Sequence, residues 1–595
     1  VYATRSLRST FDVPAIVSKI DTDKPGNALA GDMSDLLQFT PGVEVDNGPR
    51  RNGQTVSIRG FDAEAIITLI DGRRQNFEAA HDGRFYLDPS LLKSVEIVKG
   101  ASSAIYGGGG IGGVIAFDTK DAADLLAPGE TWGTQTTLSF QSASKQFSPV
   151  QSVYGRVGGW DLLGSAAVRG SGDIQQGNGD ELETRDFLTS ALLKAGYTFA
   201  DFNTVKLQYQ GQRNDGREPN NGAGAITNSN PLVDKLVIDN QYSLKYAYEN
   251  PANNWLQPKV HVYFNDTKVE ETDLSGTNAG RVQDRTIETI GFTADNQTKL
   301  TFGESHAHTL SYGVEVYGDK QTGSSTTTGT RWDSYSSEDE AGQSQDERKL
   351  SPKVAVSYKP IEQVMLFGSW AKAFRAPNMT ELYPAGQHYP GNNFVANPDL
   401  SPETVTTIEI GAGLNFKAVL NQGDKARIKG AWFSSDGKDF ISQQITGTTT
   451  QYVNVPNAKL VGWEVEGTYQ LDPVSVTLGA SYVTAKNEDT GANLDNNVPL
   501  TFIADVNYKV DAIDSVFGLR GRFANANERA SSTSGLTDGY GVVDLYYRWR
   551  PDDSKQDGML LDLGIENLFD KSYSRRYGSL NEPGRNYVAR LNYTW

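Results

Sequence analysis

Length, composition and charge restrict what this 595-residue chain can be. A formal net charge of -18 argues against a nucleic-acid-binding protein, because a phosphate-binding surface needs a positive field. Hydrophobic residues make up only 37% of the chain, and no run approaches the roughly 18 apolar residues that a membrane-spanning helix needs. The chain is therefore either soluble or crosses a membrane as strands, and in lipid only a closed barrel pairs every backbone group of such strands.

Residues 1–125 mix short apolar runs with turns, which predicts a small α+β domain. Met33 to Leu37 predicts a short helix, because Pro and Gly follow it closely. Val95 to Val98 and Val114 to Phe117 predict strands. We expect residues 126–595 to form a second domain, because the sequence pattern changes at this point.

Beyond about residue 130, apolar and polar residues alternate with a period of two. In Tyr242 to Glu249 and in Tyr587 to Trp595, every second residue is Tyr, Leu, Ala or Trp, and the residues between include full charges. Successive side chains of a strand point to opposite faces, so each segment has an oily face and a wet face.

A soluble sandwich with the oily faces in a dry core is the alternative to a membrane barrel. The alternation continues over roughly 460 residues, far more than one sandwich contains. The oily faces are also rich in Tyr and Trp, as in the aromatic girdles of membrane barrels. We therefore expect an all-β transmembrane barrel, with Gly323 to Gly329 and Ser334 to Gln345 as parts of one long polar loop.

The chain has five His residues. His306 and His308 lie between two strand-like segments, and we interpret them as part of a short polar turn, because a metal site needs more ligands than this pair supplies. His261 lies within a predicted strand and is interpreted as a residue of the wall. His81 and His388 lie in loop-like sequence, and loops often carry binding residues.

Several short motifs near the N-terminus resemble, in their order and spacing, the plug of the TonB-dependent receptors. Asn567 to Tyr573 similarly resembles the last hairpin of that family. The motifs of the plug are Ile58-Arg59-Gly60-Phe61, Ile70-Asp71-Gly72, Val95 to Gly100, Ser103 to Gly107 and Gly112 to Ile115.

The resemblance implies a barrel of roughly 22 antiparallel strands with a small N-terminal α+β plug inside its lumen. It implies a monomer in the lipid of the bacterial outer membrane. It also implies energy input from the TonB complex through a short extended segment, which we expect just before or around Val1 to Ala3. A targeting segment is expected to be absent or already removed, because the chain begins with polar sequence.

Two further boxes resemble the haem-uptake receptors within this family. Phe374-Arg375-Ala376-Pro377 and Asn397-Pro398-Asp399-Leu400 flank His388, and Ala80-His81 precedes Leu87-Asp88-Pro89. The resemblance implies that haem, free or on a haem-carrying protein, is the transported ligand rather than a prosthetic group.

Haem iron accepts axial ligands on two opposite sides, and His nitrogen and Tyr phenolate are common choices. We expect His81 on the plug to supply one ligand. For the opposite side His388 and Tyr389 rank nearly level, and Tyr383 ranks third.

Other functions are weighed against this one. A receptor for a ferric siderophore or another metal chelate would use the same fold without axial ligands. A passive pore or an adhesin is the alternative of another class, and the plug argues against a pore because it fills the lumen. We expect no enzyme, since the sequence contains no nucleophile elbow, phosphate loop or closed metal cluster.

Overall fold

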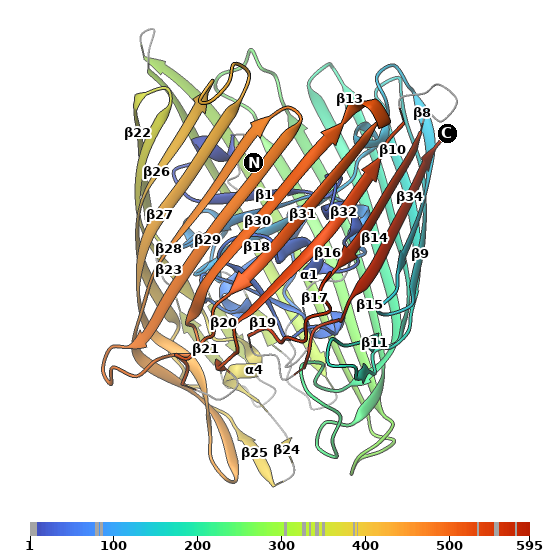
Figure 1. Cartoon of the computed structure of the whole chain (residues 1–595). Helices are drawn as coiled ribbons and strands as arrows, with labels where there is room; N and C mark the ends of the chain where they lie inside the picture. Colours follow the sequence, from blue (N-terminus) through green and yellow to red (C-terminus); the bar gives the residue numbers. More distant parts are fainter. Residues whose placement is uncertain are drawn as a thin grey trace.

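The computed structural model describes residues 9–77, 83, 87–302, 306–323, 329–331, 335–338, 344–347, 351–384, 387–389, 391–531, 535–551, 558–576 and 580–595. Figure 1 shows a closed cylinder of long tilted strands, with the N-terminal part of the chain, in blue, inside it. No helix in these ranges is long and apolar enough to cross a membrane.

The inner domain is built on a five-stranded sheet in the order β1-β6-β7-β4-β5, in which only β4 and β7 run parallel. The predicted helix and the two predicted strands are confirmed as α1, β6 and β7. The elements are η1 (Thr10–Asp12), β1 (Val17–Asp21), η2 (Asn27–Leu29), α1 (Met33–Leu37), β2 (Val43–Asp46), η3 (Arg51–Gly53), β3 (Thr55–Ile58), η4 (Ala63–Ala65), β4 (Ile66–Ile70), β5 (Arg73–Arg74), η5 (Pro89–Leu91), β6 (Leu92–Lys99), α2 (Ser103–Tyr106), β7 (Gly113–Thr119) and α3 (Ala122–Leu125).

The outer cylinder is one closed sheet in which β34 pairs with β8, so that the ring has no open edge. Neighbours pair antiparallel, apart from the short parallel pairing of β25 with β28. The predicted all-β barrel of about 22 strands with a plug in its lumen is confirmed.

The first half of the ring consists of β8 (Trp132–Gln141), β9 (Gln146–Val157), β10 (Trp160–Ser171), β13 (Asp186–Phe199), β14 (Asn203–Pro219), β15 (Leu232–Tyr248), β16 (Lys259–Asp273), β17 (Val282–Phe302), β18 (His306–Gly323), β19 (Gly329–Arg331) and β22 (Lys353–Ile361). The second half consists of β23 (Val364–Arg375), β24 (Gln387–Tyr389), β25 (Asn392–Val395), β26 (Glu403–Lys417), β27 (Lys425–Ile445), β28 (Thr449–Leu471), β29 (Val474–Asn487), β30 (Val498–Val510), β31 (Ser515–Ala524), β32 (Tyr540–Trp549), β33 (Met559–Glu566) and β34 (Asn586–Thr594). Outside the ring lie β11 (Ile174–Gln175), β12 (Glu181–Leu182), β20 (Tyr335–Glu338), β21 (Ser344–Glu347), α4 (Met379–Leu382) and η6 (Asp511–Ile513).

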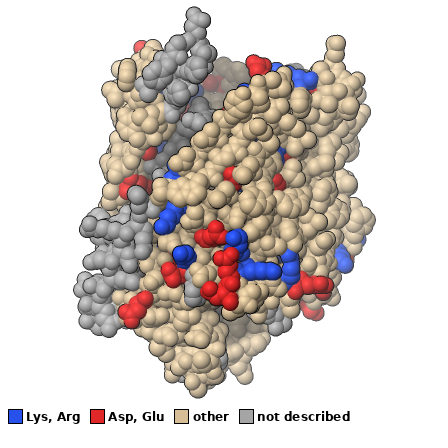
Figure 2. All heavy atoms as spheres, turned by 90° about the vertical axis from the view of Figure 1, so that its left-hand side faces the viewer, with Lys and Arg blue, Asp and Glu red and all other residues tan. Residues whose placement is uncertain are grey.

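The two faces of the wall are the reverse of those of a soluble protein. Leu207, Leu244 and Val262 are in register on neighbouring strands and are 58%, 49% and 42% exposed on the outside. Gln208 and Gln210, on the inner face, are 2% and 0% exposed. Figure 2 is consistent with an apolar outer band, because most charged side chains on the face that it shows lie in the lower half and at the upper rim. An apolar outer band of this kind is stable in lipid, and the sandwich alternative would have hidden it in a core.

The two ends of the barrel differ in the length of their connections. At one end the strands are joined by tight turns such as residues 158–159, 362–363 and 472–473. At the other end, which is the lower one in Figure 1, the connections include residues 376–402 and 567–585. We call these the short-turn end and the long-loop end. In outer-membrane barrels the short turns face the periplasm and the long loops face the outside.

Two predictions about local structure are modified. His306 and His308 do not lie in a turn, because they are the first residues of β18 and pair with Phe302 and Leu300 of β17. Strand pairing continues to this point because it satisfies backbone groups that a turn would leave open. The polar stretch Ser334 to Gln345 contains most of a short hairpin, β20 paired with β21. The interpretation of His261 as a wall residue agrees with its place in β16.

The apolar outer band predicts where on the barrel surface a charged substitution destabilises the protein. Val262→Arg should destabilise the barrel by about 2–4 kcal/mol, because it places a charge in the middle of the apolar band. Asp266→Arg, four residues further on the same face of β16, is the matched control and should cost at most about 1 kcal/mol. Urea unfolding in phospholipid bilayers measures both values, and equal costs would contradict a lipid-facing band.

Candidate functional site

A cavity of about 500 Å³ lies between the plug and the barrel strands near the long-loop end. We call it the site cavity. The plug contributes Phe61, η4 and Phe77, and the barrel contributes Arg375, Phe440 of β27 and Tyr452 of β28. Phe61 and Phe440 meet edge to face across it, with ring centroids 6.3 Å apart. The volume falls in the range of about 300–1,000 Å³ that is typical of small-molecule pockets.

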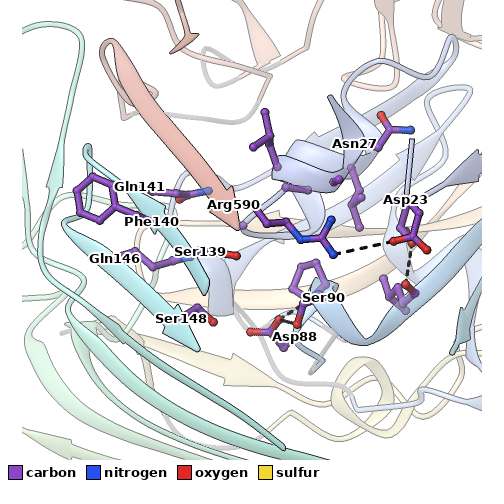
Figure 3. Close-up of a pocket in the computed structure, with 18 of the residues that line it drawn as sticks. Asp23, Asn27, Asp88, Ser90, Ser139, Phe140, Gln141, Gln146, Ser148 and Arg590 are labelled. Carbon is purple, nitrogen blue, oxygen red and sulfur yellow. Dashed lines mark hydrogen bonds and ion pairs between the residues drawn. The ribbon is translucent and has the colours of Figure 1, made fainter. Parts of the chain in front are cut away.

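Figure 3 shows a much smaller cavity, between the N-terminal part of the plug and strands β8, β9 and β34. Asp23 of the plug faces Arg590 of the wall there, at 4.0 Å. The space amounts to about 30 Å³. That is room for a water molecule rather than for a ligand of the size of a porphyrin.

The predicted ligand His81 lies outside the described residues, but both flanks of its loop are placed. Phe77 packs against Val237, Val269 and Ile287 on β15 to β17 and also borders the site cavity. On the other flank, the Gly83 amide donates to the carbonyl of Asn52, at 2.6 Å. The loop therefore begins at the barrel wall beside the cavity and returns to the plug near η3.

Arg375 holds the base of the loop 376–402 through two carboxylates. Its guanidinium donates to both oxygens of Glu381, at 2.8 and 2.9 Å, and to both oxygens of Glu403, at 2.8 and 2.9 Å. All three side chains are buried. Glu381 also accepts from the Asn378 amide and Glu403 from the Ile441 amide, both at 2.8 Å. The planar guanidinium suits this double bidentate arrangement, which Lys could not reproduce.

Tyr383, the third-ranked candidate ligand, is buried in a small apolar cluster within the same loop. The cluster contains Ala376, Leu382 and Leu400, so it joins the two boxes on either side of His388. Its position at the base of the loop distinguishes Tyr383 from the two higher-ranked candidates, which lie further along the loop.

His388 and Tyr389 lie on β24, and their side chains are outside the described residues. The hairpin of β24 and β25 projects beyond the barrel rim at the long-loop end (Figure 1). Its second strand is fixed to β28, where the Asn392 side chain bonds to Thr450 at 2.7 Å and to the Thr446 carbonyl at 2.9 Å. The backbone of both candidates is thus carried on a hairpin that is anchored at Asn392, the first residue of its second strand, to the turn between β27 and β28.

The lining of the cavity is acidic. Asp62 and Glu64 come from the plug, and Asp495 comes from the loop after β29. Asp62 remains 52% exposed, but the surrounding protein desolvates its carboxyl group and raises its pKa to about 7, against the pull of Arg576 at 3.5 Å, and nearby Glu64 adds to the rise. In the described part of the chain, no group of three or more His, Asp or Glu side chains is placed to hold a metal ion.

Sequence reasoning missed the two carboxylates that bind Arg375. Glu381 and Glu403 lie within a few residues of the two boxes around His388, on their C-terminal sides. A buried Arg in a loop needs carboxylates nearby, so an acidic residue close to each box was the available signal.

Loss of the Arg375 cluster should release the loop without unfolding the barrel. Arg375→Ala leaves two buried carboxylates without their cation, which costs about 3–5 kcal/mol locally. Hydrogen exchange at the Asn393 amide, which donates to the Thr448 carbonyl at 2.9 Å, should therefore accelerate strongly. Arg213→Ala breaks an exposed ion pair with Asp215 and should cost at most about 1 kcal/mol. Unchanged exchange in Arg375→Ala would show that the cluster does not hold the loop.

Residues 9–114 match the family model described as TonB-dependent Receptor Plug Domain, and residues 159–568 match TonB dependent receptor-like, beta-barrel. The chain is 31% identical to the Hemin receptor of Yersinia enterocolitica over 648 aligned residues, which cover 100% of this chain and 93% of that protein. It is 26% identical to the Heme/hemopexin utilization protein C of Haemophilus influenzae, with 98% of this chain and 95% of that protein covered.

Among solved structures, the hemophore receptor HasR of Serratia marcescens, in complex with its hemophore HasA and heme, superposes with a TM-score of 0.83. The identity is 20%, and the match covers 98% of this chain and 100% of that chain. This similarity shows the fold alone. Because one family model spans more than half of the chain and the Yersinia relative matches it over its whole length, the chain belongs to the family of TonB-dependent receptors.

Proposed function

We propose that this chain is a haem receptor of the bacterial outer membrane and imports haem with energy from the TonB complex. Its family consists of receptors and transporters and not of enzymes. Haem is the proposed cargo because relatives that match over nearly the whole chain are named for hemin and heme. We propose residues 1–125 as the plug and 126–595 as the barrel of a monomer, with the plug reaching TonB through its N-terminal segment.

The observation that supports this function is that the site cavity is bordered by a residue at the start of each predicted ligand loop. The His81 loop starts at Phe77 on its border, and the loop of His388 and Tyr389 is fixed by Arg375 on its border. We propose that His81 binds one face of the haem iron and that His388 or Tyr389 binds the other. Tyr383 ranks below both, because its ring is buried at the base of the loop.

This arrangement couples binding to release. A ring held between the plug and an external loop loses one iron bond when the plug moves. The outer membrane has no ATP and holds no ion gradient, so work must come from the inner membrane. A pull on the plug shifts the receptor to a conformation with lower affinity for the ligand. A ligand bound tightly enough to be scavenged can then leave toward the periplasm.

Haemin titration of the purified receptor tests the clamp. The wild-type protein should give a sharp Soret band, and His81→Ala should lose one axial ligand and shift the band toward a high-spin position. His388→Ala and Tyr389→Phe separate the two loop candidates, since only one should change the spectrum. Tyr383→Phe should leave it unchanged. A triple variant His81→Ala, His388→Ala, Tyr389→Ala that kept the wild-type spectrum would exclude the clamp.

Asp62 should make haemin binding depend on pH. At pH 8 its carboxylate is ionised and opposes a ligand that carries two propionates, whereas at pH 6 it is largely protonated, because its pKa is about 7. Asp62→Asn should therefore bind haemin several-fold more tightly than wild type at pH 8, an effect of about 1 kcal/mol. The two proteins should converge at pH 6. At each pH, the ratio of the wild-type Kd to the Asp62→Asn Kd cancels the effects of the titration of haemin and of the axial ligands, which the two proteins share. A ratio that is the same at both pH values would contradict this role.

A further inference from the structure

A third cavity, of about 470 Å³, lies nearer the short-turn end, between the edge of the plug sheet and strands β13 to β18. We call it the lysine chamber. Lys194 of β13, Lys206 of β14 and Lys245 of β15 line its wall, and Asp71 and Asp121 of the plug face them.

Three of the cations in the lysine chamber belong to the wall and have partners in the plug. Lys194 donates to the Asp121 carboxylate at 2.9 Å and to the Thr119 carbonyl at 3.1 Å. Lys206 donates to the other oxygen of Asp121, at 2.8 Å. Lys245 donates to the backbone carbonyl of Asp71, at 2.6 Å. Any movement that separates this part of the plug from the wall therefore breaks these contacts.

The segment 71–77 runs between the two large cavities. Asp71 borders the lysine chamber, and Phe77 borders the site cavity. The segment contains β5, the two-residue edge strand of the plug sheet, which pairs through Leu69 with Arg74 and Ile70 with Arg73. The plug also holds the segment through the Asp71 carboxylate, which accepts from the amide and the hydroxyl of Thr119, and through the Gln75 amide, which donates to the Thr68 carbonyl. The segment is therefore joined to the plug sheet and would leave the wall together with it.

The other side of the segment is held by polar contacts with the wall. Arg73 donates to Gln241 and to Gln210, both at 2.8 Å, and Arg74 donates to Glu315 at 2.7 Å. Gln208 donates to Asp71 at 2.5 Å. All of these contacts join plug to wall, so they would separate together when the segment withdraws.

Withdrawal of segment 71–77 would take Asp71 away from Lys194 and Lys245, and it would take Arg74 away from Glu315 on β18. Asp121 precedes α3, close to the start of the barrel, and it would remain between Lys194 and Lys206. Asp118 is the other plug carboxyl group at this place, and burial with Asp71 and Glu96 nearby raises its pKa to about 7. On β13 to β15, the ammonium groups of the three lysines would then face the carboxylate of Asp121 and the partly protonated Asp118. Buried charges without partners are unfavourable, so an anion would be favoured in their place.

We propose that the lysine chamber is a second, transient binding site for the carboxylate groups of the transported ligand, opened when segment 71–77 leaves the wall. Lys245 and Lys194 then exchange their plug partners for ligand carboxylates, and the ligand passes along β13 to β18 toward the short-turn end. This step rests on the proposed function, because haem brings two propionates to the chamber.

Charge removal in the chamber separates this step from ligand capture. The double variant Lys194→Gln, Lys245→Gln should bind haemin at the outer site with a Kd within about twofold of wild type. Its TonB-dependent uptake of haemin by cells at limiting concentration should fall about tenfold or more. Lys194→Arg, Lys245→Arg is the control that retains the charge, and it should keep uptake near wild type. Normal uptake in the Gln variant would overturn the proposal, as would an equal loss in the Arg variant.

A reversible bridge tests the movement itself and does not depend on the Gln variant assembling. The chain has no Cys, so Asp71→Cys with Gln208→Cys can be joined by a short bis-methanethiosulfonate reagent, which forms a reducible disulfide with each thiol and releases sulfinate. The bridge should stop haemin uptake, reduction should restore it, and haemin binding should stay unchanged. The control pair Gln38→Cys with Arg575→Cys, whose native side chains meet at 3.1 Å, ties the plug to a long loop away from the chamber.

The two bridges have distinct outcomes. Uptake that continues while the Asp71–Gln208 bridge is in place overturns the proposal. An equal block by both bridges also overturns it, because the effect would then not be specific to the lysine chamber. A wild-type receptor that fails to bind haemin would instead contradict the proposed function. A wild-type receptor that binds and imports haemin but ignores every change in the chamber contradicts only this inference.

Discussion

The need to pair every backbone N–H and C=O group inside lipid is the constraint on which the rest of this structure depends. A closed ring in which β34 returns to β8 meets it, and the ring then requires apolar side chains outside and leaves the lumen free to be polar. The buried side of each strand consequently carries Gln, Lys, Asp and Arg, as at Gln208 and Arg590. A plug that fills such a lumen must be held by ion pairs and hydrogen bonds with the wall.

The motifs that resemble the family supply those plug–wall contacts. Arg59 of the first motif pairs with Glu409 of the wall at 2.7 Å and also with Glu464, and its guanidinium lies over the Phe433 ring. Lys99 of a later motif reaches the same Glu464, at 3.2 Å. Breaking a buried pair costs several kcal/mol while it stays dry, but the charges are hydrated once the plug moves and water enters. A polar interface of this kind can hold the plug at rest and still be reversible, which an apolar core of the same area would not allow.

The sequence predicts the fold better than the site, for a physical reason. Alternation over residues such as Tyr242 to Glu249 is local, and a period of two indicates a strand whatever its partners are. The end of β17 shows the limit of this reasoning, since His306 and His308 look like a turn until their pairing with β17 is known. The Arg375 cluster is not local either, because Glu403 reaches it from another strand. His81, His388 and Tyr389 remain predictions, since what their side chains contact depends on loops rather than on a repeating pattern.

The segment from Asp71 to Phe77 extends from the lysine chamber to the site cavity. The segment is joined to the plug sheet through β5, Thr119 and Thr68, and it contacts the wall through Arg73, Arg74 and Asp71. A pull along the chain from the N-terminus loads β1 first, and β1 pairs with β6 at the opposite edge of the sheet from β5. The load must therefore cross β6, β7 and β4 before it reaches the segment. In the proposed transport step, the segment would therefore leave the wall only under a force that disturbs the whole sheet.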